Sequence, residues 1–156
     1  MKITIEELAT LIINNADLTG IDYSHITDMS GMFEGQESIR YIKPFDTSHV
    51  TNMTRMFMNC ENLISVPLLN TNNVTRMGGM FYGCRSLKII PLFNTINVIN
   101  MINMFSECIS LEKIPHLNTE SVIDMNHMFS ECSELYTIPL FNTSNVIDMN
   151  GMFYGC

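Results

Sequence analysis

The sequence predicts an α/β repeat solenoid, and two observations carry that prediction. Five cysteines recur every 24 residues, at positions 60, 84, 108, 132 and 156. Slots for valine or isoleucine, for two methionines and for phenylalanine recur with the same period from residue 21 to residue 156, without an insertion. A fixed period of this size is typical of coils that stack on one another. We therefore expect about five and a half repeats over residues 21–156, preceded by a separate segment, residues 1–20.

The segment of residues 1–20 predicts a short amphipathic helix that caps the first coil. Thr4 followed by Glu7 has the spacing of a capping box. Apolar residues follow at helical spacing, namely Ile5, Leu8, Leu11 and Ile12. A solenoid needs such a cap because its end coil would otherwise expose the core. A helix that binds a partner is the functional alternative.

Each repeat divides into two halves. The first half, as in residues 87–95, places Leu87, Ile90 and Leu92 at the spacing of a short strand in a parallel stack. The second half, as in residues 98–105, has apolar residues at i, i+3, i+6 and i+7, which predicts short helical or 3₁₀ turns.

Two further slots bear on the backbone. A slot just before the cysteine predicts the left-handed conformation that ends helices, because glycine or asparagine often holds it. Its residues are Gly35, Asn59, Gly83, Glu107, Glu131 and Gly155, of which the two glutamates fit less well. A proline slot in the strand half predicts a short or distorted strand, because proline lacks a ladder donor. Its residues are Pro67, Pro91, Pro115 and Pro139.

The repeat resembles the BspA-like leucine-rich repeats. The resemblance lies in the run Leu-x-x-Ile-Pro-Leu-Phe-Asn-Thr-x-Asn-Val-x-x-Met-x-x-Met-Phe-x-x-Cys, at residues 87–108 and again at 135–156, and it extends over residues 21–156. It implies a right-handed leucine-rich-repeat solenoid used for adhesion or protein binding, with no catalytic residues. Many members are secreted or lipid-anchored surface proteins, so the resemblance implies the cell surface.

Composition excludes several classes of protein. Apolar residues make up 46% and charged residues 15%, which is too apolar for a disordered chain. The net charge of −8 argues against a nucleic-acid partner, because such proteins carry basic patches. No apolar run approaches the roughly 18 residues of a membrane span. Glu6 and Glu7 stand where a signal peptide is apolar, so the sequence by itself predicts a cytoplasmic or virion location.

The cysteines are expected to form an interior ladder of free thiols that pack as small apolar side chains. Stacked side chains point the same way rather than at each other, which disfavours disulfides between coils. Zinc sites use short spacings such as CxxC, and the chain has none. Disulfides or a metal remain the alternatives, and no cofactor is predicted.

Other columns offer weaker candidates. His25 and His49 share one slot and could form a two-histidine metal site, although the slot also holds asparagine and serine as a polar turn position. Columns of threonine (Thr47, Thr71, Thr95, Thr119, Thr143) and of Asp or Asn (Asp46, Asn70, Asn94, Asn118, Asn142) could template a flat ligand. Their structural interpretation is that stacked amides and hydroxyls satisfy the turn backbone. The methionine columns are expected in the core rather than on a soft binding face or as copper ligands.

The candidate binding face comes from the two slots that vary most. One column is Arg40, Ile64, Lys88, Glu112 and Tyr136, and the next is Tyr41, Ser65, Ile89, Lys113 and Thr137. We expect one of the two to face the concave side of the sheet, where solenoids bind their ligands. Tyrosine and arginine are frequent at binding hot spots. The alternative is that both columns are merely solvated strand positions.

The sequence therefore predicts a non-catalytic binding module for a protein or glycan ligand. The alternative is a structural or receptor-binding segment of an assembly, such as a phage tail fibre or spike. No nucleophile–base pair, phosphate loop or carboxylate cluster supports an enzyme. The last coil has no predicted cap, so we expect either end-to-end self-association there or a longer parent solenoid, with fraying of the last half-coil as the alternative.

Overall fold

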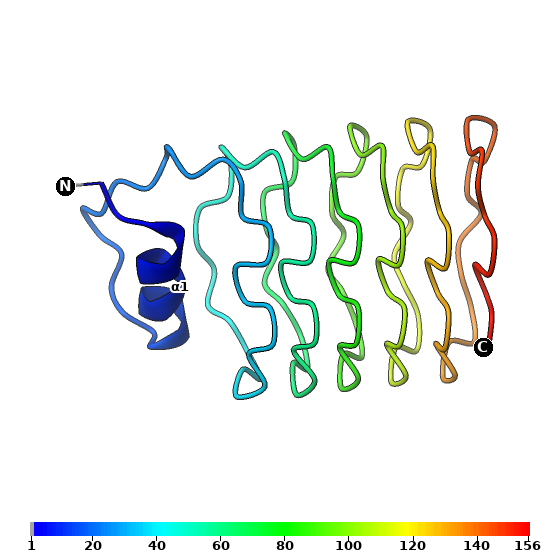
Figure 1. Cartoon of the computed structure of the whole chain (residues 1–156), viewed down its shortest axis with the longest axis horizontal. Helices are drawn as coiled ribbons and strands as arrows, with labels where there is room; N and C mark the ends of the chain where they lie inside the picture. The colour runs from blue at the N-terminus through cyan, green and yellow to red at the C-terminus, as the bar shows by residue number, and fades with distance from the viewer. Residues whose placement is uncertain (1) are drawn as a thin grey trace.

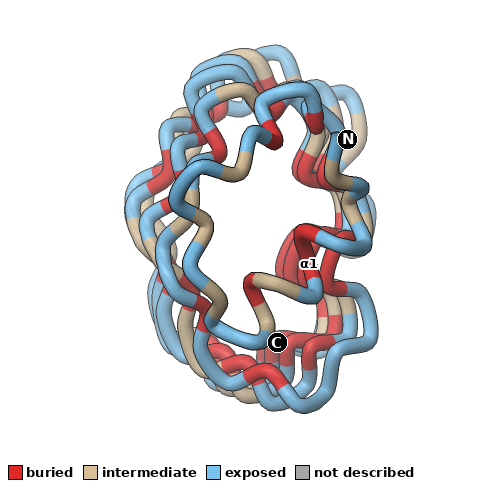
Figure 2. Tube along the Cα trace, turned by 90° about the vertical axis from the view of Figure 1, so that its left-hand side faces the viewer, coloured by how far each residue is buried: buried red, intermediate tan, exposed pale blue. Residues whose placement is uncertain are grey.

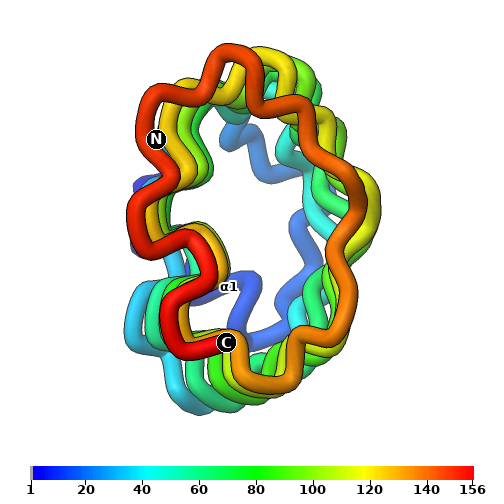
Figure 3. The backbone as a smooth tube through the Cα atoms, turned by 90° about the vertical axis from the view of Figure 1, so that its right-hand side faces the viewer, coloured from blue at the N-terminus to red at the C-terminus, as the bar shows by residue number. Residues whose placement is uncertain are grey.

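The chain forms a stack of coils, and the computed structural model describes residues 2–156. Coils 1 to 6 begin at residues 21, 45, 69, 93, 117 and 141, and they lie side by side along the long axis (Figure 1). Seen from the C-terminal end, each coil is a flattened oval with two long sides (Figure 3). We call the side built by residues 87–95 and their equivalents the leucine side. The side built by residues 97–108 and their equivalents is the methionine side. The predicted repeat solenoid is confirmed.

Helix α1 (Ile5–Ile13) closes the N-terminal end of the stack. Its capping box forms as expected, because the Thr4 side chain accepts from the Glu7 amide and the Glu7 carboxylate accepts from the Thr4 amide at 2.8 Å. Leu8 and Ile12 are buried in the same core as the coils. Figure 2, viewed from the N-terminal end, places α1 within the outline of the coils. The apolar face of α1 is therefore used by the fold itself.

The methionine side is not helical, which corrects the expectation of regular helical or 3₁₀ turns. In coil 4, the amides of Met104 and Cys108 donate to carbonyls three residues back, at 3.2 and 3.0 Å. Other amides of this side point out of the coil. Those of Met101 and Phe105 donate to the carbonyls of Asp124 and Met128 in coil 5, at 3.0 and 2.9 Å. Hydrogen bonding thus alternates between turns within a coil and bonds to the next coil.

Left-handed residues cause this alternation. Every residue in the slot before the cysteine has positive φ, as predicted, including Glu107 at 60° and Glu131 at 62°. A second slot four residues earlier was not predicted, and it is left-handed in every coil: Gly31, Arg55, Gly79, Asn103, His127 and Gly151. A right-handed helix cannot propagate through a left-handed residue every fourth position. A residue other than glycine in this left-handed conformation carries a conformational cost of about 1–3 kcal/mol.

The leucine side does not form a continuous parallel strand ladder. Among residues 2–156 its only bridge pairs Lys113 with Thr137. The regular parallel bridges lie at the start of the methionine side instead, linking Asp28, Asn52, Arg76, Asn100, Asp124 and Asp148 in sequence. Two features explain the difference. The proline slot removes one backbone hydrogen-bond donor per coil. Hydrogen bonds between coils on this side are also long in places, as from the Glu112 amide to the Lys88 carbonyl at 3.4 Å.

The core consists of identical side chains stacked coil on coil. The phenylalanines at 33, 57, 81, 105, 129 and 153 stack nearly parallel, with ring centroids 5.3–5.7 Å apart. The methionine slots are likewise inside except at Met149 in coil 6, and Met101 and Met104 have no exposed surface. The interpretation of these columns as core is confirmed.

The cysteines form the predicted ladder of free thiols. Cys60, Cys84, Cys108 and Cys132 are buried and unbridged, whereas Cys156 is exposed. Each thiol donates to the carbonyl of the phenylalanine 27 residues earlier, as Cys108 does to Phe81 at 3.0 Å. Burial raises the pKa of Cys60 and of Cys132 to about 12. These thiols stay protonated at neutral pH and serve as buried hydrogen-bond donors.

Candidate functional site

The two variable columns predicted from the sequence both face solvent. Eight of the ten residues in these two columns are exposed, among them Tyr41, Lys88 and Tyr136. The other two, Ile64 and Ser65, are half-buried. The buried positions of the leucine side recur every three residues, as at Leu87, Ile90 and Phe93. Two consecutive residues therefore point outward, where a regular strand would send them to opposite faces.

A third exposed column lies beside the predicted two. Leu68, Leu92 and Leu140 are 68%, 62% and 92% exposed. The expectation that Leu92 belongs to the buried face of a strand is wrong, because Phe93 is the inward residue. The signal for this was the spacing of three between apolar positions 87, 90 and 93. We name the three columns together the variable face: Arg40, Tyr41, Pro44, Ile64, Ser65, Leu68, Lys88, Ile89, Leu92, Glu112, Lys113, His116, Tyr136, Thr137 and Leu140.

The variable face combines large apolar side chains with positive charge. Six of the large exposed apolar residues lie on it: Tyr41, Leu68, Ile89, Leu92, Tyr136 and Leu140. It carries three basic residues, Arg40, Lys88 and Lys113, against the single acid Glu112. The whole chain has the opposite balance, with 16 acidic and 8 basic residues. The face is therefore locally basic on an acidic protein.

The two histidines of the candidate metal pair are engaged separately. His25 Nε2 lies 3.0 Å from the Ile3 carbonyl. The His49 ring packs edge-on against Tyr23 at 5.6 Å, and its Nδ1 lies 4.0 Å from the Asp46 carboxylate. Within residues 2–156, no three His, Cys, Asp or Glu side chains gather as metal ligands do. The pair has structural contacts and no third ligand.

The threonine and Asp/Asn columns serve the turn backbone. Thr95 is 1% exposed, and its hydroxyl donates to the Asn118 carbonyl at 2.8 Å. The Asn94 side-chain oxygen accepts from the Ile96 amide at 3.2 Å, as its counterparts do in the other coils. The hydroxyls of Thr47, Thr71, Thr95 and Thr119 are buried in this way and cannot template a ligand, so the structural interpretation holds for coils 2 to 5.

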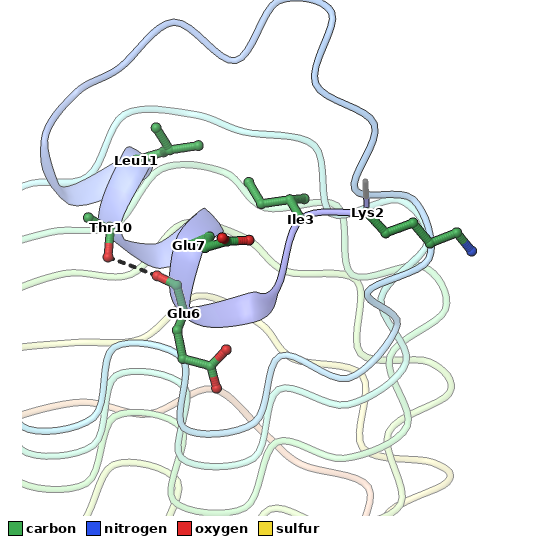
Figure 4. Close-up of a pocket in the computed structure, with 6 residues that line it drawn as sticks. All are labelled: Lys2, Ile3, Glu6, Glu7, Thr10 and Leu11. Atoms are coloured by element: carbon green, nitrogen blue, oxygen red, sulfur yellow. Dashed lines mark hydrogen bonds between the residues drawn. The ribbon is translucent and has the colours of Figure 1, made fainter.

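A hollow of about 570 Å³ lies on the outer side of α1 (Figure 4). Lys2, Glu6, Glu7 and Leu11 are among its lining residues. Glu7 is committed to the capping box, and the Glu6 carbonyl accepts from the Thr10 hydroxyl at 2.8 Å. The remaining side chains do not converge on a common point in Figure 4. The hollow is thus a groove beside the cap without a set of converging polar groups.

The chain has similarity to known families and structures. A family model described as "Mycoplasma protein of unknown function, DUF285" matches residues 4–89 and 65–156. No curated protein matches the chain. None of the helical structure in residues 2–156 has the length and hydrophobicity needed to cross a membrane.

Two solved structures are similar over part of their length. A leucine-rich repeat protein from Bacteroides ovatus is 25% identical, with a TM-score of 0.47, over 71% of this chain and 34% of that one. A leucine-rich repeat protein from T. pallidum is 22% identical, with a TM-score of 0.36, over 56% of this chain and 50% of that one. The chain thus spans between a third and a half of the length of these proteins.

Proposed function

The chain belongs to the family described as Mycoplasma proteins of unknown function, DUF285, and we propose that it is a non-catalytic module that binds a protein through the variable face. Adhesion at a cell surface is the form of this function that the resemblance to BspA-like repeats favours. The proposal rests on the large apolar residues that the leucine side exposes to solvent.

The exposed apolar residues of the variable face carry the proposal. Leu68, Leu92 and Tyr136 are each more than 60% exposed, although the positions that follow Leu68 and Leu92 are buried. Contiguous exposed apolar surface on a soluble protein usually marks a protein interface. Tyrosine and arginine, which this face also carries, are enriched at such interfaces.

The charge of the face indicates the chemistry of the partner. Three basic residues against one acid favour a partner whose contacting surface combines apolar and acidic side chains. A branched aliphatic side chain such as Leu68 offers nothing to sugar hydroxyls, so a protein fits this face better than a glycan does.

The test uses variants that are expected to keep the fold. Cross-linking capture with the wild-type chain identifies a partner, and titration calorimetry measures its affinity. The double variant Leu68→Asp, Leu92→Asp should weaken binding by about tenfold or more, because hot-spot truncations commonly cost above 1 kcal/mol each. Ile123→Thr is the matched control, since Ile123 is 43% exposed on the methionine side and its slot accepts Thr51 and Thr75. Equal affinity of wild type and double variant, or capture of glycans alone, would contradict the proposal.

A second function is favoured by coil 6. We infer that the chain also associates end to end through coil 6, which suits a paired or terminal element of an assembly such as a fibre or spike. The amides of Met125 and Phe129 donate to coil 6, whereas those of Met149 and Phe153 have no acceptor among residues 2–156. Phe153 is 46% exposed, and α1 covers the opposite end.

Since α1 covers the N-terminal end, contact through coil 6 should join two chains of this sequence as a pair. Sedimentation velocity over a concentration series should show monomers and dimers in exchange. Phe153→Lys should shift the series to monomer, while Ile123→Thr should leave it unchanged. A wild-type chain that stays monomeric at every concentration would exclude the pairing.

A further inference from the structure

A hollow of about 280 Å³ opens on the methionine side, away from the variable face. It lies where coil 3 carries two consecutive glycines, Gly78 and Gly79. Every other coil has at least one side chain at these two slots, as at Thr54–Arg55 and Ile102–Asn103. Gly79 is left-handed at φ +61°, which explains glycine there, but Gly78 is not left-handed. A Cβ on Gly78 would lie 2.7 Å from the Asn100 side-chain oxygen, so glycine at this slot leaves room for the Asn100 amide at the edge of the hollow.

One wall of the hollow is an aromatic ring held in place from behind. The Tyr82 hydroxyl donates to Glu107 at 2.6 Å. The Arg85 guanidinium holds the other oxygen of that carboxylate at 3.0 Å. A ring fixed in this way loses little conformational freedom when a ligand arrives, which favours binding. The hydrogen bond to Glu107 also raises the pKa of Tyr82, so the phenol remains a donor.

The second wall carries a positive charge without a partner. Arg55 is exposed and takes part in none of the ion pairs found in residues 2–156. Its side-chain stem borders the hollow, with Cγ 3.5 Å from the position that a Cβ on Gly79 would take. A guanidinium in this setting prefers a carboxylate, which it binds with two parallel hydrogen bonds.

The third wall supplies side-chain amides that have free hydrogen-bonding groups. The Asn100 side-chain oxygen accepts from the Ile102 amide at 3.2 Å, and its NH₂ group has no partner among residues 2–156. The Asn103 side chain, also in the lining, makes no hydrogen bond in that range. An amide can both donate to and accept from a hydroxyl group. The hollow therefore combines a cation, a ring and two free amides.

We propose that this hollow binds an acidic pyranose, such as a uronic acid or sialic acid residue of a glycan. The carboxylate pairs with Arg55, the apolar face of the sugar ring packs on Tyr82, and sugar hydroxyls bond to the amides of Asn100 and Asn103. The volume lies just below the usual range of about 300–1,000 Å³ for ligand pockets, so a single sugar residue fits. An acidic peptide side chain would use Arg55 but leave the ring and both amides unused. This site is independent of the protein-binding face proposed above.

The first experiment titrates ¹⁵N-labelled protein with glucuronate, N-acetylneuraminate, glucose and an acidic hexapeptide. A ligand of this size at ordinary ligand efficiency should bind with a Kd of about 1 mM. Amide shifts should be confined to residues 54–58, 78–82 and 100–103. Glucose should bind about tenfold more weakly or worse, since a charge-assisted bond contributes at least that factor. No shifts with either acidic sugar at about 20 mM, or tighter binding of the peptide, would overturn the proposal.

The second experiment borrows substitutions from equivalent slots, so the fold should tolerate them. Arg55→Asn copies Asn103, which has the same left-handed backbone, and Tyr82→Ser copies Ser106. Each should weaken acidic-sugar binding about tenfold. Tyr154→Ser changes the same slot in coil 6 and should leave binding unchanged. If Arg55→Asn and Tyr82→Ser melt normally and bind as wild type does, the site is not the hollow.

Discussion

Coil 4 and coil 6 carry the same residues in their methionine slots, yet they bury them differently. Met101 and Phe105 have no exposed surface, whereas Met149 and Phe153 are each 46% exposed. Coil 1 behaves like coil 4, with Phe33 fully buried, because α1 covers its outer side. Burial in this fold is therefore a property of the neighbouring coil rather than of a coil's own sequence. Identical substitutions at different coils should consequently differ in cost.

The largest difference is expected between Met101→Asp and Met149→Asp, which share one slot. A carboxylate in place of Met101 is buried without a partner and should lower the free energy of unfolding by about 4 kcal/mol. That corresponds to a fall in melting temperature of about 10 °C for a chain of this size. Met149→Asp should cost less than about 1 kcal/mol, because water reaches that site. Thermal unfolding followed by circular dichroism measures both, and equal losses would show that coil 6 is covered in solution.

The cap gives the second prediction. Leu8→Ala should cost about 3 kcal/mol, since Leu8 has no exposed surface and packs on the coils. Hydrogen exchange should then rise at amides 29–35 of coil 1, with amides 125–131 of coil 5 unchanged. Thr10→Ala on the exposed side of α1 should have an effect below about 0.5 kcal/mol. Uniform loss of protection along the chain would mean that the stack unfolds as one unit.

A smaller, stabilising effect is expected at the left-handed slot. Glu131 has φ 62°, where glycine is free of the steric cost, so Glu131→Gly should raise the free energy of unfolding by about 1 kcal/mol. Asn59→Gly is the comparison, because asparagine tolerates this conformation and should gain almost nothing. A loss of stability in Glu131→Gly would show that the Glu131 side chain makes contacts worth more than the strain.

The last prediction needs no substitution. At pH 8, Ellman's reagent should react quickly with one thiol of the native protein, Cys156, and with five after denaturation. A thiol with a pKa of about 12, such as Cys60, is only about one part in ten thousand thiolate at that pH. Five fast thiols in the native protein would show that the ladder opens readily, and no fast thiol would show that Cys156 is covered.

The period of the sequence was enough to predict the contents of the core. Residues at one slot lie above one another in successive coils. A column made only of phenylalanine or only of cysteine is apolar, so it is expected to be buried. The exposed column of Leu68 and Leu92 was not predicted, because leucine is usually taken as core and the distinction depended on a spacing of three. The left-handed slot of Arg55 and His127 was also missed, because its residues share a backbone angle and no chemical type.

The sequence did not predict the proposed sugar site, because its contacts join residues from different slots. Tyr82 reaches Glu107, one coil and one residue further along the chain, so the pair joins two different slots. Gly78 makes room for the Asn100 side chain of the next coil, and in a sequence it resembles any other turn glycine. Such features become visible only when neighbouring coils are placed side by side.

The forward hydrogen bonds of the methionine side have a consequence for how such chains change length. Each bond joins a residue to one 23 positions ahead, as from Phe105 to Met128, whichever coil it starts from. Deleting or duplicating 24 residues therefore rejoins the remaining layers with every partner in register. Since a repeat is a whole number of codons, unequal recombination between repeats preserves both the reading frame and the fold. A gene of this kind can gain or lose a binding surface one layer at a time, while an insertion whose length is not a multiple of 24 residues shifts the register of the coil that receives it.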